Sequence, residues 1–460
     1  MRTLIKNGKI ADERGIYEGD IYIEDGIIKK IGKDLKDDCE NLVEAKGKLI
    51  IPGGVDVHTH FNLHAGNFIA EDDFYSGTVA AACGGTTTIV DHMGFGPKGC
   101  SLFHQARVYH EYAKDSVIDY GFHGVIQHID DDILNELEIM IRDEGISSFK
   151  IYLTYDFKIE DGDVLRLMER LKGLGGILCI HCENDSIINY LKKEFINEGK
   201  REPIYHSKSR PDLCEAEAVG RIIDICDMAQ NPNIYIVHLS TLKALERVKK
   251  VKQSGQNIFA ETCPQYLLLS EDKYLNEDGI KYILSPPLRD KNNQQFLWEG
   301  IRQGLIDAVA TDHCPFSLQY KNYGKDDFTK CPNGIGGVEE RIPLMFSEGV
   351  MKGRISLSKF IEVCCTNPAK IFGLYPKKGT ISIGSDGDLV IIDTEKETVL
   401  SKDMLHSRCD YTAYEGLKLK GYPVLTLSRG EVIVKDNEFI GERGRGQYLK
   451  RLGNLNKKGC

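Results

Sequence analysis

The chain has 460 residues, of which 41% are hydrophobic, enough to bury a large core in one big domain with a smaller domain beside it. A formal net charge of −10 and a pI near 5.8, with no concentrated Lys/Arg patch, argue against nucleic-acid or anionic-membrane partners and favour a small-molecule partner. The absence of a secretory signal pattern and of any apolar run of about 18 residues, together with 14 scattered cysteines, predicts a cytoplasmic protein with free thiols.

Both ends of the chain have the pattern of small β units, in which short alternating apolar runs are broken by turn residues. The N-terminal pattern extends to about residue 51, and a matching pattern returns at 379–393 and 424–434. We therefore expect residues 1–51 and 374–440 to pair into one β-sandwich domain, followed by a tail over 441–460.

Between residues 52 and 373, short apolar strands alternate with amphipathic helical stretches, which is typical of repeated βα units around a parallel sheet. Apolar residues at helical spacing predict helices over 163–174 and 216–228. Eight strand candidates predict a closed (β/α)8 TIM-like barrel as the catalytic domain. They cover residues 55–60, 86–91, 119–125, 148–153, 177–181, 234–238, 257–262 and 307–312.

Ionisable side chains close several of these apolar runs. On a strand, residues i and i+2 share a face, so His58 and His60 lie side by side with Asp56 beneath them and can share one divalent ion. The C-terminal ends of barrel strands converge on one mouth, so the side chains at these ends are expected to meet there. The candidate set is His58, His60, Lys150, His181, His238 and Asp312.

Lys150 and Asp312 offer more than a simple ligand atom. Desolvation inside an apolar strand would lower the pKa of the Lys150 amine, and a neutral amine could react with CO₂ to give a carbamate that bridges two metals. The alternative is a lysine that extends to solvent. The Asp312 carboxylate can contact a metal and transfer a proton, whereas strand parity turns His313 to the opposite side, where we expect a structural role.

Two further patterns are interpreted as structural. Cys179 and Cys182 form a Cys-x-x-Cys pair, but on a strand they face opposite sides, which favours core thiols. The glycine-rich run 94–99 lacks the Gly-Lys-Ser/Thr ending of a phosphate-binding loop.

Aromatic residues follow several of the predicted strands. The loops 61–73, 93–99 and 152–160 should rim the mouth of the barrel, where their aromatic rings could form an apolar wall for a ring substituent. The alternative is that individual rings pack the loops against the barrel. The rings in question are Phe61, Phe68, Phe95, Tyr152 and Phe157.

Short motifs over almost the whole chain resemble one enzyme family. They are Gly54-Val-Asp-Val-His-Thr-His60, Gly84-Gly-Thr-Thr-Thr88, Ser148-Phe-Lys150, His181-Cys-Glu-Asn184, Tyr235-Ile-Val-His-Leu-Ser240, Glu261-Thr-Cys-Pro-Gln-Tyr266, Ser285-Pro-Pro-Leu-Arg289, Ala310-Thr-Asp-His-Cys-Pro315 and Pro332-Asn-Gly334. In this combination the chain resembles the cyclic amidohydrolases of the hydantoinase and dihydropyrimidinase family. The runs 60–62, 92–97 and 123–128 most resemble those of the bacterial D-phenylhydantoinases within it.

The resemblance implies two divalent metal ions per subunit, with zinc favoured and manganese or cobalt as alternatives. The implied ligands are His58, His60 and Asp312 for the more buried ion, His181 and His238 for the more exposed ion, and Lys150, as a carbamate, for both. No metal is implied for His92, which we interpret as packing. A homotetramer is also implied.

The implied reaction is hydrolysis of D-5-substituted hydantoins with an aromatic substituent, giving N-carbamoyl-D-amino acids. A hydroxide that bridges the metals would attack the ring carbonyl, Tyr155 would stabilise the oxyanion, and Asp312 would transfer the proton to the leaving nitrogen. Main-chain groups at Ser285 and Asn333 would hold the substrate ring. A dihydropyrimidinase that opens dihydrouracil or dihydrothymine is the nearest alternative, and a non-catalytic scaffold or binding relative is a remote one.

Overall fold

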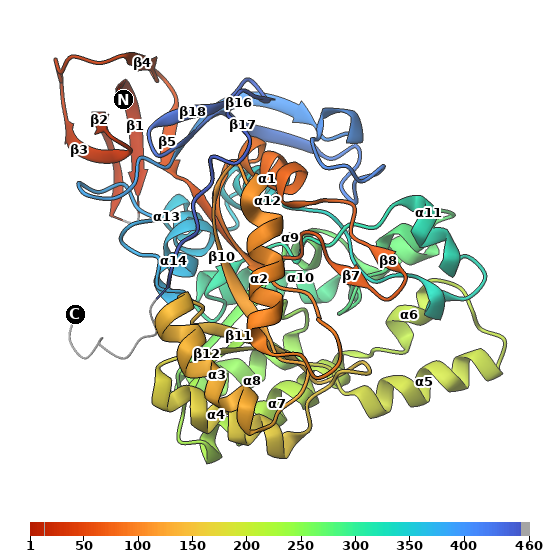
Figure 1. Ribbon diagram of the computed structural model, residues 1–460. Coiled ribbons are helices and arrows are strands. Elements are labelled where there is room, and N and C mark those ends of the chain that lie inside the picture. Colours follow the sequence, from red (N-terminus) through yellow and green to blue (C-terminus); the bar gives the residue numbers. More distant parts are fainter. Residues whose placement is uncertain (13, 452–460) are drawn as a thin grey trace.

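The computed structural model describes residues 1–12 and 14–451 (Figure 1). Within these residues, eight parallel strands form one sheet in the order β15-β14-β13-β12-β11-β10-β9-β6. They are β6 (Gly54–Thr59), β9 (Thr86–His92), β10 (Asp119–Val125), β11 (Ser148–Tyr152), β12 (Ile177–His181), β13 (Asn233–Ile236), β14 (Ile258–Thr262) and β15 (Ala308–Val309). Thr59, at the end of β6, forms a bridge with His313 just beyond β15, which brings the two edges together. The predicted (β/α)8 barrel is confirmed.

Two barrel strands are shorter than predicted. The predicted strand over 234–238 ends at Ile236, and the one over 307–312 ends at Val309. The backbone turns into the left-handed region shortly afterwards, with φ of 37° at His238 and 54° at Asp312, and such angles do not fit an extended strand. The chain therefore leaves strand geometry close to two of the candidate functional side chains.

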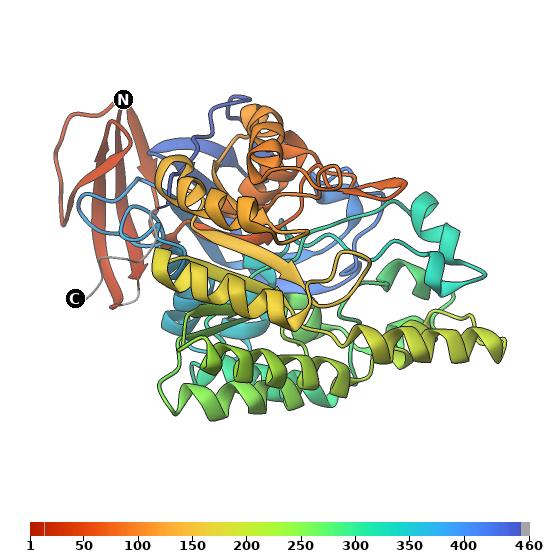
Figure 2. The same cartoon turned by 60° about the horizontal axis from the view of Figure 1, so that its bottom comes forward.

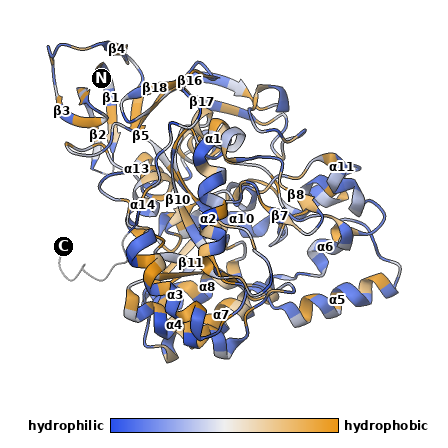
Figure 3. Ribbon diagram, viewed as in Figure 1, coloured by the Kyte–Doolittle hydropathy of each residue, from blue (hydrophilic) through white to orange (hydrophobic). Residues whose placement is uncertain are grey.

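Helices surround the barrel. They are α1 (Phe74–Cys83), α2 (Leu102–Tyr112), α3 (Asp131–Ile139), α4 (Asp161–Leu174), α5 (Asp185–Asn197), α6 (Ile204–Lys208), α7 (Asp212–Met228), α8 (Leu242–Lys252), α9 (Pro264–Leu268), α10 (Asn292–Arg302), α11 (Leu318–Lys321), α12 (Arg341–Leu344), α13 (Leu357–Ile361) and α14 (Asn367–Ile371). Helices α4 and α7 confirm the two predicted ones, with slightly earlier starts. Hydrophobic and hydrophilic residues are interspersed along α3 and α4 (Figure 3), and the apolar residues of α4, such as Leu167 and Leu171, are buried. No helix of the described chain combines the length and apolarity needed to cross a membrane.

The two chain ends pair with each other, as predicted. Within the described residues they form a nine-stranded sheet in the order β19-β18-β17-β16-β5-β1-β2-β3, with β4 beside β1. These strands are β1 (Arg2–Asp12), β2 (Gly15–Glu24), β3 (Ile27–Gly32), β4 (Asn41–Glu44), β5 (Leu49–Pro52), β16 (Leu389–Val399), β17 (Lys418–Ser428), β18 (Glu431–Lys435) and β19 (Glu438–Phe439). Antiparallel pairing of β5 with β16 joins the two halves, which lie beside the barrel in both views (Figures 1 and 2). A small hairpin, β7 (His64–Ala65) and β8 (Phe68–Ile69), extends from the loop after β6.

The chain after β19 returns to the barrel. The Leu449 N–H donates to the Tyr120 carbonyl at 2.7 Å, and the buried Arg451 guanidinium donates to the Phe122 carbonyl and, at 2.9 Å, to Ser148 Oγ. This part of the predicted tail therefore packs against β10 and β11, and residues 452–460 lie outside the described residues.

A buried lysine links the sheet domain to the barrel. The Lys378 ammonium lies 2.6 Å from Asp119, at the start of β10, and 2.8 Å from both Asp386 and Asp388, and its side chain is fully buried. Because a buried carboxylate without a cation is costly, this one ammonium group stabilises three acidic side chains from two parts of the chain.

Substitution Lys378→Met should lower the free energy of unfolding by roughly 3–5 kcal/mol, since it takes the buried cation away from Asp386 and Asp388, although Arg429 still pairs with Asp119. Chemical denaturation monitored by circular dichroism would measure the loss. The control Lys420→Met removes an exposed pair with Glu395 and should change stability by less than about 0.5 kcal/mol. Equal stability of the two variants would contradict the assigned role of Lys378.

Candidate active site

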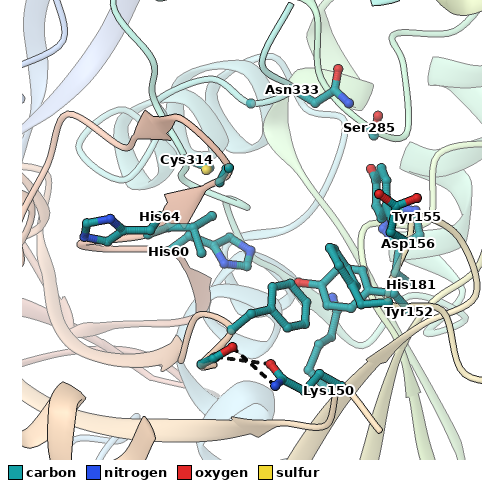
Figure 4. A pocket seen from close by; sticks show the side chains of 18 of the residues that line it. His60, His64, Lys150, Tyr152, Tyr155, Asp156, His181, Ser285, Cys314 and Asn333 are labelled. Atoms are coloured by element: carbon teal, nitrogen blue, oxygen red, sulfur yellow. Dashed lines mark hydrogen bonds between the residues drawn. The ribbon is translucent and has the colours of Figure 1, made fainter. Parts of the chain in front are cut away.

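The six predicted ligand residues line one cavity of about 790 Å³ at the C-terminal ends of the barrel strands. Figure 4 shows His60 facing Tyr155 and Ser285 across this space, with Lys150 and His181 extending into it. Asp312 Oδ1 lies 3.1 Å from Nε2 of both His58 and His60, and ligand atoms of these three residues lie within 4.8 Å of one another. This group can therefore hold one metal ion.

The second pair of histidines lies beside the first group. The rings of His181 and His238 are 4.6 Å apart between centroids, and His238 lies 5.5 Å from His58. Burial lowers the pKa of both imidazoles and lowers that of His60 to about 4, so all three favour the neutral form that binds metals. These donors suit a divalent cation.

Lys150 is buried at the centre of this arrangement. Its side chain, on β11, is 1% exposed, and burial lowers the pKa of its amine although Asp312 and Glu261 oppose the shift. The alternative of a lysine that extends to solvent is therefore wrong.

Tyr155, Ser285 and Asn333 line the other side of the cavity. Tyr155 has a left-handed backbone with φ of 74°, which places its ring 5.6 Å from that of His181. The loops that carry Ser285 and Asn333 are joined by the buried Lys321, whose ammonium donates to the carbonyls of Ile283 at 2.6 Å and Pro332 at 2.8 Å.

Three of the predicted aromatic residues form a wall of the cavity. The Phe95 ring lies 3.8 Å from that of Phe157 and 5.6 Å from that of Tyr152, between centroids, and all three residues line the cavity. The other two pack elsewhere, Phe61 against Phe74 and His313, and Phe68 against aromatic residues of the 316–323 segment.

Comparison with known proteins decides the family. The profile of the Amidohydrolase family matches residues 49–433. The chain belongs to the amidohydrolase family. It is 50% identical over 455 residues to a D-phenylhydantoinase of Escherichia coli O1:K1 / APEC, covering 98% of each chain. Two solved structures are similar over 98% of this chain and 99% of theirs, namely dihydropyrimidinase from Brevibacillus agri NCHU1002 (TM-score 0.97, 39% identity) and D-hydantoinase from a Bacillus sp. AR9 (TM-score 0.96, 41% identity).

Members of the amidohydrolase family are metal-dependent hydrolases, and the group of His58, His60 and Asp312 gives this chain a place for a metal. Burial opposes a charge on His58, but the Glu261 and Asp312 carboxylates together outweigh it and raise the pKa of this imidazole to about 9. A bound divalent cation would replace the proton as the positive charge facing Glu261 and Asp312, so metal binding would release that proton.

Glu261 supports this amidohydrolase site, a role that its place in the sequence motif 261–266 does not by itself reveal. Its carboxylate accepts hydrogen bonds from His58 Nδ1, from the Tyr235 hydroxyl at 2.8 Å and from the His238 N–H at 3.0 Å. One buried side chain on β14 therefore orients two candidate ligands. A carboxylate at the end of an apolar strand was the available signal.

Glu183 and Arg210 support His181 in a similar way. His181 Nε2 bonds to Glu183 at 2.8 Å, and the buried Arg210 guanidinium pairs with Glu183 and lies 5.6 Å from the Tyr155 ring centroid. Burial opposes ionisation of Glu183, but Arg210, His181 and Arg289 together outweigh it and lower the pKa of this carboxyl to about 2. No spacing in the sequence links Arg210 to the strand ends.

Two further histidines of this amidohydrolase, His313 and His92, lie near the candidate ligands. His313 Nε2 bonds to Asp72 at 3.0 Å, and its Nδ1 accepts from the Gly337 and Val338 N–H groups, in line with the predicted structural role. His92 is buried, and its ring centroid lies 4.2 Å from that of His123 and 4.4 Å from that of His58.

Substitution Glu261→Gln should lower metal affinity roughly 10- to 100-fold while the fold is retained, because His58 loses the carboxylate that orients its ring. Metal retained after dialysis against graded chelator would measure the effect, with circular dichroism as the check on folding. Tyr235→Phe removes one neutral donor to Glu261 and should retain more metal than Glu261→Gln. Wild-type metal retention in Glu261→Gln would refute this support.

Proposed function

We propose that this amidohydrolase opens the ring of D-5-substituted hydantoins, preferring an aromatic substituent, and releases N-carbamoyl-D-amino acids. The observation that carries the proposal is one cavity that combines the buried His/Lys/Asp group with an aromatic wall of Phe95, Tyr152 and Phe157. The 50% identity to a D-phenylhydantoinase over 98% of both chains supports it.

The proposal includes two divalent ions, with zinc favoured over manganese or cobalt because imidazole and oxygen donors suit it. His58, His60 and Asp312 would hold one ion, His181 and His238 the other, and Lys150, as a carbamate, would serve both. When bound, the ions supply Lewis acidity and lower the pKa of water. Burial of Lys150 supports the carbamate because it favours the neutral amine that reacts with CO₂.

Other residues around the substrate would orient it, stabilise the oxyanion and transfer the proton. Main-chain groups at Ser285 and Asn333 would orient the ring amide, and the Tyr155 hydroxyl would donate to the carbonyl oxygen as it becomes negative. Asp312 would accept the proton of the attacking water and return it to the ring nitrogen. A C–O bond forms, the ring C–N bond breaks, and the carbamoyl group stays on the amino acid.

A dihydropyrimidinase remains the second candidate, because the same amide occurs in the six-membered rings of dihydrouracil and dihydrothymine. The similarity to the Brevibacillus agri dihydropyrimidinase supports this candidate. The aromatic wall favours the hydantoin, since neither dihydropyrimidine carries an aromatic substituent. A non-catalytic scaffold is disfavoured, because all six ligand positions and Tyr155 line one cavity.

We also infer a homotetramer in the cytoplasm. The resemblance to the hydantoinase family supports the tetramer. Buried free thiols such as Cys179, Cys226 and Cys364 support a reducing compartment.

A substrate panel tests the function. If the aromatic wall receives the D-aryl substituent as proposed, the purified metal-loaded enzyme should hydrolyse D-5-phenylhydantoin faster than L-5-phenylhydantoin and faster than dihydrouracil. Chiral chromatography of the product would identify the N-carbamoyl-D-amino acid. Faster opening of dihydrouracil would favour the second candidate, and no turnover with both metals bound would favour the scaffold.

Substitution Asp312→Asn should reduce kcat by about 10²- to 10⁴-fold, because the amide cannot accept the proton of water. Elemental analysis of the same preparation separates this loss from loss of a ligand, and variants with equal metal content are the ones to compare. Near-normal turnover with both metals bound would show that another group transfers the proton.

A further inference from the structure

The loop that carries Phe95 has a turn of its own only at its far end, where the Cys100 N–H donates to the Pro97 carbonyl at 3.0 Å. It runs from residue 93 to residue 100 and includes Gly94, Gly96 and Gly99, whose backbones have many accessible conformations. Yet Phe95 must be held in one place if its ring is to lie 3.8 Å from that of Phe157 and form a wall of the cavity. Contacts from outside the loop must supply that order.

Gln127 supplies most of the hydrogen bonds that hold the 93–100 loop from outside. It follows β10 by two residues and lines the same cavity. Its Oε1 accepts from the Gly96 N–H at 3.1 Å, and its Nε2 donates to the carbonyls of Gly96 at 3.3 Å and Pro97 at 2.8 Å. The side-chain amide therefore pairs with the loop backbone on both sides of Gly96, much as a neighbouring strand would.

A second amide completes the attachment. Gln105, on α2, donates from Nε2 to the Gly94 carbonyl at 2.6 Å. A Cβ at position 96 would lie 2.5 Å from Cys100 Sγ and 2.9 Å from Gln105 Oε1, so the tight fit needs glycine there. Beyond the Met93 N–H, which donates to the His123 carbonyl at 3.2 Å, the loop is thus held through its backbone by two glutamines, one on each side of Phe95.

We propose that Gln127 is a specificity-positioning residue, which holds Phe95 against Phe157 so that the wall can receive the aromatic substituent of the substrate. This inference rests on the proposed function and adds to it the residue that sets the preference for aryl substrates. Gln127 does not bond to His58, His60, Lys150, His181, His238 or Asp312, so its loss alters the wall and leaves the hydrolytic group intact.

The test compares two substrates that share one ring. In Gln127→Glu, the carboxylate loses both donations and repels the carbonyls of Gly96 and Pro97. We expect kcat/KM for D-5-phenylhydantoin to fall about tenfold, mainly through KM, while kcat/KM for unsubstituted hydantoin stays within about twofold. Gln127→Met, which is uncharged and of similar size, should show the same selective loss.

Gln294→Glu is a matched control. Gln294 Nε2 donates to the Leu269 carbonyl at 2.9 Å, so this variant also removes an amide-to-backbone bond, at a site that does not line the cavity. It should leave both substrates unchanged. Hydrogen exchange in the 93–100 peptide should accelerate in Gln127→Glu and not in Gln294→Glu.

A double-mutant cycle separates positioning from general destabilisation. Phe95→Ala removes the ring that Gln127 is proposed to hold, so adding Gln127→Glu to it should cause no further loss of selectivity. Additive losses, equal losses on both substrates, or no loss in Gln127→Glu would each overturn the proposal. If the wild-type enzyme opens neither hydantoin, the proposed function fails, and unchanged exchange at 93–100 in Gln127→Glu would then separately overturn the positioning role.

Discussion

A charged group that is buried at the mouth of the barrel needs a partner of opposite charge or a hydrogen bond. This requirement determines which side chains surround the candidate ligands. His58 is paired with Glu261, His181 with Glu183, and Glu183 in turn with Arg210. Each carboxylate fixes the ring it contacts and compensates the positive charge that the site gathers. The same requirement acts at the sheet domain, where Lys378 compensates acidic side chains from both parts of the chain. The supporting residues are thus as much a condition of the site as the ligands.

Backbone geometry is the second constraint. Tyr155, His238 and Asp312 all have positive φ, which costs on the order of 1–3 kcal/mol for each non-glycine residue. Buried bonds offset this cost, since the His238 N–H donates to Glu261, and Thr311, next to Asp312, donates to the Asp56 carboxylate at 2.7 Å. In an extended strand, successive side chains point to opposite faces. With a left-handed backbone, the side chains of Tyr155, His238 and Asp312 all line the cavity instead.

The sequence predicted the barrel, its eight strands and the pairing of the chain ends, because alternating and helical hydrophobic patterns are local signals. It also predicted which ionisable residues meet, because barrel topology brings strand ends together. It did not predict the shortened ends before His238 and Asp312 or the support from Arg210 and Lys321, since such features depend on tertiary contacts without a characteristic spacing. The direction of loop aromatics was equally hidden, so the sequence left open whether Phe61 and Phe68 line the wall or pack their loops, and both pack elsewhere.

The two sides of the cavity therefore differ in how their backbones are held in place. The hydrolytic side consists of strand ends held by buried ion pairs, where one displaced side chain leaves a charge uncompensated. The aromatic side consists of loops, of which the one carrying Phe95 is attached through two neutral amides. Neutral hydrogen bonds contribute about 1 kcal/mol each, so this side can change shape at modest cost while the other cannot. Sequence changes in the wall can accordingly alter the shape of the cavity without disturbing the candidate metal ligands.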